Sequence, residues 1–406
     1  MYVRKTTEKT NEGINEGIII GQQPQIEITS YGSFQKGNSH KVWRYRGQNK
    51  QIQQRHKITK HMFLSDFSYK DSSGWTLTNL SLGSQNLVVG MNAVGKSRTV
   101  HAIGNVASFI RGVGPSNLGN FECSLIWRNG NSLEYSFEVF DGEIRSEILR
   151  AKGEALIKRE QFSAKMYGER INPPSGKLII QTRRDTQRYP EIEEIIGWAE
   201  HTSLFIFSNI TTSPKSLSPY AISREPLLPE MFSKLSDSQK KQLKKMIGDL
   251  GYPIANITES EKENGAKILL IYEDGVSIPL LPFDLSNGMF RVFCILNYML
   301  YFSTLPQARC LIIDDMGEGL DYRRSSELGQ ILFDYCKSNN IQLIVTSNDS
   351  FLLDTISLDY WNILTRKGNI VHSLNNKNSK ELFEEFARTG LSNFDILSSN
   401  FLSNNK

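Results

Sequence analysis

The stretch "NLVVGMNAVGKS", residues 86–97, decides the fold that we expect, because it joins an apolar run to a glycine-rich loop. Gly90, Gly95, Lys96 and Ser97 stand at the G-x-x-x-x-G-K-[ST] spacing. Glycines let the backbone wrap an anion, so that N–H groups and a helix N-terminus face phosphate oxygens. Lys96 would reach the β- and γ-phosphates, and the Ser97 hydroxyl would complete a Mg²⁺ shell. The stretch therefore predicts a strand, a phosphate loop and a helix.

A second apolar run, "CLIIDD" at residues 310–315, ends in two adjacent carboxylates. Asp314 at the strand end would hold Mg²⁺ through water. Asp315 would lie nearer to the γ-phosphate and accept a proton from the attacking water. Acidic turns after strands are common, but downstream of a phosphate loop this pair predicts a site that splits a nucleotide.

The stretch "DLSNGMFR", residues 284–291, predicts a second anion-binding helix end. Ser286 would cap the helix, and Gly288 is a small residue close to the N-terminus, where backbone N–H groups attract anions. The alternative is an ordinary capped helix without a ligand.

The order of patterns along the chain predicts an α/β fold. Residues 1–57 read as an extension, and strands begin after His61. Alternating strands with hairpin turns at Asn129-Gly130 and Asp141-Gly142 predict an antiparallel lobe within about residues 120–220. A helical lobe is expected at about 225–300, with two helices meeting near Ser236 and ending at Gly251.

Two strands, "AKILLIYE" and "VSIPLL", are expected to meet at Asp274-Gly275. From Ser286 onward, helices alternate with apolar strands, which indicates a parallel sheet. Residues 376–406 form a C-terminal helical segment that either docks a partner or packs on its own domain.

Composition and charge exclude several classes of protein. The longest apolar run, residues 290–302, has thirteen residues and contains Arg291 and Asn297, too few to cross a bilayer. No secretory signal is visible, so we expect a cytoplasmic protein without membrane contact. The four cysteines lie far apart in apolar segments and are expected to be buried hydrophobes, without zinc.

The net charge of +4 is mild, but the segment Arg145–Arg188 holds eleven Lys/Arg residues against five Asp/Glu. This basic lobe is either a solvated face or a surface for nucleic acid or an acidic protein.

Four motifs together resemble a known family. "GMNAVGKS", "LSNGMFR", "LIIDDMGEGLD" and "LIVTSND" follow the order of phosphate loop, signature, Walker B with D-loop, and switch of the ABC-type ATPases. The chain looks like the branch with SMC-type heads and the ATPase part of the OLD (overcoming lysogenisation defect) nucleases. The resemblance covers about residues 58–375. It implies a P-loop NTPase head with a mixed β core, an antiparallel lobe and a helical lobe.

The resemblance also implies a head-to-head dimer with two ATP molecules and Mg²⁺ between the subunits. Ser286 and Gly288 of one copy would face the γ-phosphate bound by the other, with Asp321 at the D-loop contact. Metal binding falls to Ser97 and Asp314, and catalysis to Asp315 and Asn348. The nucleotide-binding residues would be Gly90, Asn92, Gly95, Lys96, Ser97, Arg98, Ser286, Gly288 and Asp321.

Two departures from the family pattern predict slow hydrolysis. The usual catalytic glutamate is Asp315, which is one methylene shorter, and the usual switch histidine is Asn348, which cannot carry a proton. Each change would cost roughly one to three orders of magnitude in rate. The glutamine loop stays open between Gln161 and Gln181. An adenine-stacking aromatic residue would be one of Phe67, Tyr69 and Trp75, unless all three are core.

The first functional hypothesis is an ATP-switched homodimer or higher oligomer that acts as sensor or scaffold. By resemblance, its partner would be a separately encoded effector such as a nuclease, in bacterial antiphage defence. The alternatives are a DNA-engaging recombination or repair ATPase that uses the Arg145–Arg188 lobe, and a scaffold that binds ATP without turnover. A small-molecule kinase is disfavoured, because it would not need "LSNGMFR".

Overall fold

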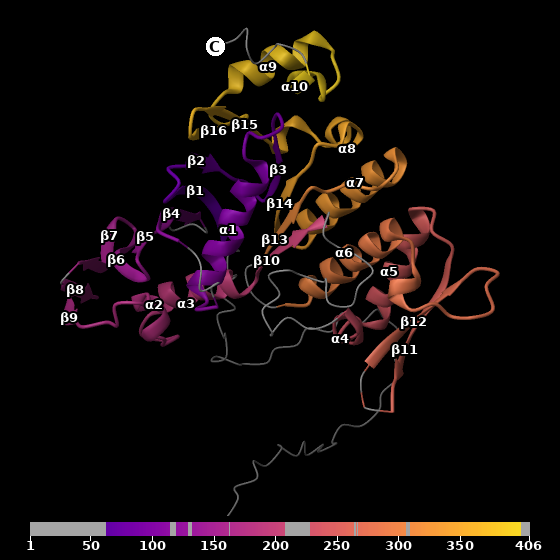
Figure 1. Ribbon diagram of the computed structural model, residues 1–406, viewed down its shortest axis with the longest axis horizontal. Helices are drawn as coiled ribbons and strands as arrows, with labels where there is room; N and C mark the ends of the chain where they lie inside the picture. The colour runs from indigo at the N-terminus through magenta and orange to yellow at the C-terminus, as the bar shows by residue number, and fades with distance from the viewer. Residues whose placement is uncertain are drawn as a thin grey trace, which may run out of the picture. The chain divides into compact units, whose positions relative to one another are not determined.

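A computed structural model describes residues 62–113, 119–128, 132–161, 163–207, 228–263, 265, 267–305 and 309–398. Within these ranges one fourteen-stranded sheet dominates the fold (Figure 1). Its strand order is β10-β13-β14-β3-β15-β16-β2-β1-β4-β5-β6-β7-β8-β9, and a separate two-stranded sheet joins β11 to β12.

The first five strands of this order run parallel and form the parallel half of the sheet. Every residue of β3, β13 and β14 is buried, as expected for strands with helices on both faces. This half confirms the alternation of helices and strands predicted after Ser286. The strands are β10 (Thr202–Ile206), β13 (Arg309–Asp314), β14 (Ile341–Thr346), β3 (Gln85–Val89) and β15 (Trp361–Lys367).

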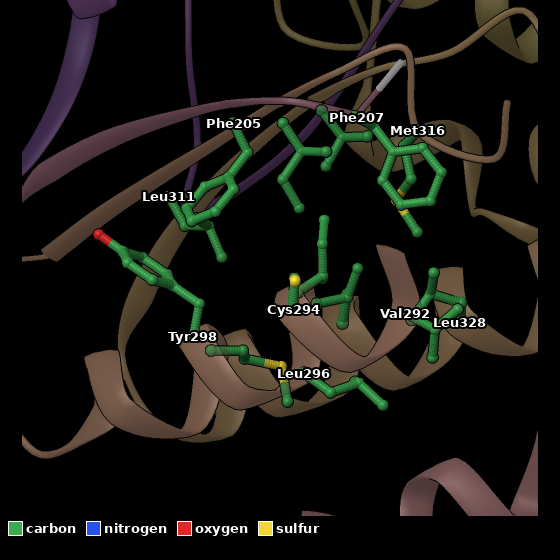
Figure 2. Packing of buried hydrophobic residues seen from close by; sticks show 14 of the residues in the cluster. Phe205, Phe207, Val292, Cys294, Leu296, Tyr298, Leu311, Met316 and Leu328 are labelled. Atoms are coloured by element: carbon green, nitrogen blue, oxygen red, sulfur yellow. The ribbon is translucent and has the colours of Figure 1, made fainter. Parts of the chain in front are cut away.

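Helices cover both faces of the parallel half. On β3, Val88 joins the hydrophobic cluster that contains α1 and α3, whereas Leu87 and Val89 join the cluster that contains α6 and α7. Figure 2 shows Cys294 and Tyr298 of α6 facing the strands. The covering helices are α1 (Lys96–Ile110) and α3 (Pro190–Glu200) on one face, and α6 (Asn287–Ser303), α7 (Tyr322–Ser338) and α8 (Ser350–Thr355) on the other.

The rest of the sheet begins with β16, which pairs antiparallel with β15 and parallel with β2. Beyond β2 each pairing is antiparallel, and buried residues alternate with exposed or half-buried ones along β4 and β5. Asp141 and Gly142 have φ of 50° and 77°, which confirms the predicted turn. Residues 129–131 lie outside the described ranges.

We call β4 to β9 the antiparallel lobe. The strands beyond β15 are β16 (Ile370–Leu374), β2 (Thr76–Ser81), β1 (Phe63–Asp71), β4 (Phe121–Arg128), β5 (Ser132–Phe140), β6 (Glu143–Ala151), β7 (Glu154–Glu160), β8 (Ser163–Met166) and β9 (Glu169–Ile171). A short helix, α2 (Ile179–Thr182), follows β9 and precedes α3.

The helical region after residue 227 contains α4 (Leu228–Ser233) and α5 (Asp237–Asp249). Ser236 caps α5 by accepting a hydrogen bond from the N–H of Gln239, which confirms the predicted junction. Gly251, with φ of 77°, follows α5 and marks the predicted end.

The predicted strand at residues 266–273 is present from Lys267 on, but its predicted pairing with residues 276–281 is limited to one bridge. β12 (Lys267–Glu273) instead pairs along its length with β11 (Ile254–Glu261). Residues 276–281 contribute one isolated bridge, between Leu280 and Ile271. The N–H of Val276 donates to Glu273 O at 3.2 Å, which closes a tight turn and takes the segment out of the register of the Leu280–Ile271 bridge.

The C-terminal segment packs on its own domain as far as the structure describes it. Phe383 and Phe386 of α9 (Lys380–Thr389) and Ile396 of α10 (Asp395–Ser398) are buried in the cluster around α6. Of the two readings of this segment, packing on its own domain is the one observed. Among the described helices, none combines the length and the hydropathy that a membrane span needs.

Candidate nucleotide-binding site

Loops from the carboxyl ends of β3, β13 and β14 meet at one edge of the parallel half. They border a pocket of about 360 Å³, at the edge where α/β sheets bind ligands. The phosphate loop supplies one wall, and Asp315 and Asn348 supply another. The lining residues are Trp75, Asn92, Ala93, Gly95, Lys96, Ser97, Arg98, Asp315, Asn348 and Arg366.

The phosphate loop has a backbone that few side chains tolerate. Gly90 has φ of 150°, and a Cβ atom there would stand 2.7 Å from the carbonyl oxygen of Leu364. Gly95 has φ of 110°, and its Cβ would meet the Trp75 ring at 3.3 Å. Between them, Ala93 also has a positive φ, 63°. The two glycines are therefore required for the chain to wrap as it does.

The Lys96 side chain folds back into the phosphate loop and is 6% exposed. Its Nζ donates to the carbonyl oxygens of Gly90, at 2.7 Å, and Met91, at 3.3 Å. Burial lowers the pKa of Lys96, and the negative charges of Asp315 and Asp314 oppose this shift. The loop thus carries a cation at the place where a phosphate would bind.

Asp314 ends β13 with a carboxylate that is 2% exposed. Burial acts to raise its pKa, but hydrogen bonds from His101, Thr346 and Ser97 outweigh burial and lower it, so the group is an anion. The Nε2 of His101 lies 2.9 Å from Asp314 Oδ2. A buried carboxylate beside the Ser97 hydroxyl is an oxygen donor set that suits Mg²⁺. The residues therefore fit the metal that the sequence predicts.

Asp315 lies in the pocket on a strained backbone, with φ of 54°. Its N–H donates to Thr346 Oγ1 at 2.8 Å. Burial, and then the charges of Asp314 and Glu318, raise the pKa of Asp315, which favours proton acceptance. Asn348 follows β14 and is exposed at the same pocket. The structure thus brings the predicted base and the predicted switch residue together.

The predicted signature and D-loop residues do not line this pocket. Ser286 caps α6, accepting from the N–H of Met289 at 3.4 Å. A Cβ atom on Gly288 would lie 3.2 Å from Leu320, so this turn packs closely against the D-loop. Asp321 caps α7 and pairs with Arg324 at 2.6 Å.

Neither candidate for the glutamine loop lies at the pocket. Gln161 is in a turn after β7, and its N–H donates to Arg145 O. Gln181 donates to the carbonyl oxygens of Phe109, at 2.6 Å, and Ile110, at the far end of α1. Beyond β13 the described part of the sheet ends in β10, whose last residue, Ile206, is in register with Asp314.

The three aromatic candidates are largely occupied in the core. Phe67 and Trp75 are buried, and the Tyr69 ring stacks on Phe121 with centroids 5.6 Å apart. Of the three, only Trp75 borders the pocket.

Sequence reasoning missed two residues at the site. His101 stands one helical turn after Ser97, so the i, i+4 spacing on the helix was an available signal. Arg366 reaches the pocket from the end of β15, and no local pattern indicated it.

The structure has the fold of a P-loop NTPase head of the SMC type, with the mixed sheet, antiparallel lobe and helical lobe that the sequence predicts. A family model described as "AAA domain, putative AbiEii toxin, Type IV TA system" matches residues 208–354. This match spans the signature, Walker B and switch but not the phosphate loop. No curated protein sequence matches the chain significantly.

Solved SMC heads resemble the structure. The SmcHead bound to the C-winged helix domain of ScpA matches with a TM-score of 0.51 and 12% identity, over 79% of this chain and 99% of that chain. The SMC head domain from Thermotoga maritima gives 0.43 and 13%, over 77% and 98%. The Smc head with an extended coiled coil, bound to the ScpA C-terminal domain derived from Pyrococcus furiosus, gives 0.46 and 11%, over 80% and 100%.

Proposed function

We propose that the chain is a slow ATPase whose two half-sites are completed by a second copy of itself. The observation that carries this proposal is the separation of the two sets of residues. The phosphate loop, Asp315 and Asn348 share a pocket, whereas Ser286 and Asp321 cap helices outside it. The chain has two helix ends suited to anions, and only one of them borders the pocket. This is the arrangement expected when a nucleotide is bound between two subunits of a dimer.

Exposed aromatic residues beside the D-loop and the switch support the same arrangement. Tyr322 at the start of α7 is 64% exposed, and Phe351 in α8 is 50% exposed. Their ring centroids are 5.4 Å apart, so the two rings form one apolar patch. Paired, exposed aromatic side chains are enriched at protein–protein interfaces. A second copy docking here would lie beside both the D-loop and the switch.

The pocket residues suit hydrolysis of the γ-phosphate. Lys96 and the loop N–H groups would bind the phosphates, and Ser97 and Asp314 would hold a Mg²⁺ ion that would neutralise developing charge on them. Asp315 accepts a proton from a water molecule while the oxygen of that water bonds to the γ-phosphorus. The bond between the γ-phosphorus and the bridging oxygen breaks, and ADP and phosphate are released. Asn348 can hydrogen-bond the γ-phosphate but cannot transfer a proton. Nucleotide therefore chiefly holds the dimer together, and occasional hydrolysis releases it.

We further propose that the dimer is the sensor or scaffold of a separately encoded effector, such as a nuclease in antiphage defence. The toxin named in the description of the matched family supports a role in conflict systems. The SmcHead structure bound to a ScpA domain is a head of this fold with a separate protein attached. In the basic segment Arg145–Arg188, by contrast, Arg159 is buried against backbone carbonyls and Arg184 pairs with Glu193, which weakens the DNA-binding alternative.

The test measures the molar mass of the full chain by light scattering, with and without ATP and Mg²⁺. We expect ATP to produce a dimer or larger assembly. Asp315→Asn should prolong that assembly and slow turnover by about a hundredfold or more, the scale of a general base. If ATP turnover is unchanged in this variant, another residue is the base.

A matched pair of serine caps separates the dimer from nucleotide binding. Ser286→Arg should abolish assembly while ATP affinity in the monomer is kept. Ser236→Arg, at the exposed cap of α5, should assemble as the unmodified chain does. An ATP-bound chain that stays monomeric, or an assembly insensitive to Ser286→Arg, would refute the sandwich.

A further inference from the structure

The strand order divides the nucleotide pocket into two flanks. The acids and the switch follow β13 and β14, which lie on one side of β3. Ser97, a Mg²⁺ ligand by its chemistry, hydrogen-bonds Asp314 on that side. The terminal phosphate and its metal therefore belong to the β13 flank. Because the nucleotide extends away from its γ-phosphate, its nucleoside half belongs to the opposite flank, formed by β15 and the start of β2.

The other large side chains on this second flank are already engaged within the protein. Trp75 is 2% exposed and lies beneath Gly95. The guanidinium of Arg98 lies over the Trp75 ring, 4.8 Å from its centroid. Arg98 also donates to Asp71 and, at 2.7 Å, to Ser73. Among the pocket-lining residues, no aromatic ring is thus left exposed as a platform for a base.

Arg366 is also exposed on this flank and, unlike Arg98, it has no acidic partner among the described residues. Its Nη1 donates to Ala93 O at 3.2 Å, and its Nε donates to Gly368 O at 2.8 Å. Within the part of the chain that the structure describes, no carboxylate forms an ion pair with it. These two bonds fix the guanidinium in the pocket and leave N–H groups and a flat face available.

We propose that Arg366 binds the nucleoside half of the nucleotide, with its guanidinium plane serving as the surface on which the base rests. A guanidinium stacks on aromatic systems and keeps its charge at any physiological pH. Arg366 would thus stack on the base in place of the three aromatic candidates from the sequence, which are largely packed in the core. This inference rests on nucleotide binding at the phosphate loop, and it adds a residue outside the four motifs.

The experiment compares three probes on the full chain by calorimetry: ATP, ADP and inorganic tripolyphosphate. Arg366→Ala should weaken ATP and ADP by the same factor, about tenfold, the scale of a partly desolvated stacking contact. Tripolyphosphate has no nucleoside, so its affinity should stay unchanged. Arg366→Lys keeps the charge but loses the plane, and should lose most of the same affinity. Lys367→Ala, at the exposed neighbour, is the matched control and should change nothing.

Two outcomes would overturn the inference. Equal weakening of tripolyphosphate would mean that Arg366 only braces the phosphate loop through Ala93 or contacts phosphate. Unchanged ATP affinity would mean that it makes no contact. Lys96→Ala separates this failure from failure of the proposed function. If Lys96→Ala abolishes ATP binding while Arg366→Ala does not weaken it, only the Arg366 assignment is wrong.

Discussion

The two halves of the one large sheet differ in what covers them. The central strands of the parallel half, β3, β13 and β14, are buried from end to end, because helices pack on both of their faces. In the antiparallel lobe, β4 buries every second residue, and the residues between them are exposed or half-buried. The difference shows that a continuous apolar run and an alternating run can belong to the same hydrogen-bonded sheet.

The halves also differ in what their loops do. Loops after β3, β13 and β14 carry strained backbone and buried charge at a pocket, whereas the turns of the antiparallel lobe at Gly142, Gly153 and Gly168 leave open space around an added Cβ. We therefore expect substitutions in the parallel half to affect nucleotide chemistry, and substitutions in the antiparallel lobe to affect stability alone.

The largest expected effect contrasts two glycines. In the parallel half, Gly90→Ala places a Cβ against the backbone of Leu364, so the phosphate loop must shift. We expect ATP affinity to fall about a hundredfold or more, which corresponds to about 3 kcal/mol. In the antiparallel lobe, Gly142 has φ of 77° with nothing within 4 Å of an added Cβ. Gly142→Ala should cost about 1 kcal/mol of stability and leave ATP affinity intact.

Calorimetric titration and denaturant unfolding of both variants measure these two quantities. The contrast between the halves would fail if Gly142→Ala weakened ATP binding, or if Gly90→Ala left it unchanged.

A smaller effect is expected at Glu147, which is fully buried in β6. Its carboxylate accepts from the Tyr135 hydroxyl at 2.9 Å and from the N–H of Ile179 at 2.7 Å. Burial outweighs these hydrogen bonds and raises the pKa of Glu147 to about 7, from 4.5. Because the folded pKa lies above the unfolded one, protonation stabilises the fold. That contribution is complete below about pH 4.5 and disappears as the pH rises through about 7.

We therefore expect the free energy of unfolding to lose about 1 kcal/mol from this group between about pH 6 and pH 8. Glu147→Gln should remove that pH dependence, and Glu143→Gln, an exposed change in the same strand, should retain it. Denaturant titrations at the two pH values give the comparison. If the Glu147→Gln variant loses as much unfolding free energy between the two pH values as the unmodified chain, the buried carboxyl group of Glu147 is not the cause of that loss.

The smallest effect is expected from the basic lobe. Arg184 pairs with Glu193 at 2.6 Å, and Arg188 lies 3.5 Å from Glu169, so part of the positive surplus is neutralised. Reversing Arg183, Arg184 and Arg188 to Glu should leave ATP affinity unchanged, and each lost surface pair should cost under about 1 kcal/mol. Anisotropy of a labelled duplex, at low and high salt, should show no change. Salt-sensitive binding that this triple variant abolishes would instead make the lobe a nucleic-acid surface.

Features set by neighbouring residues were predictable from the sequence. The phosphate loop, with its strand and helix, rests on consecutive residues whose geometry is local. The caps at Ser236 and Ser286 and the turn at Asp141-Gly142 follow from residue type and spacing in the same way.

Features set by strand pairing were not predictable. Residues 254–261 are mostly polar, and they form β11 only because β12 supplies the hydrogen-bonding partner. Arg366 reaches the pocket because β15 pairs with β3, which lies more than two hundred residues away in the chain. Gln181 fell in the expected interval of the sequence, yet the fold carries it to the opposite end of α1.

That last contact has a mechanical consequence. α1 begins at the phosphate loop and runs about 22 Å to Ile110, where Gln181 binds its final carbonyl groups. Gln181 also accepts from the N–H of Leu178, in the segment whose next two N–H groups bind Glu147 of β6. Through these hydrogen bonds, α1 connects β6 of the antiparallel lobe to the phosphate loop at the other end of the helix.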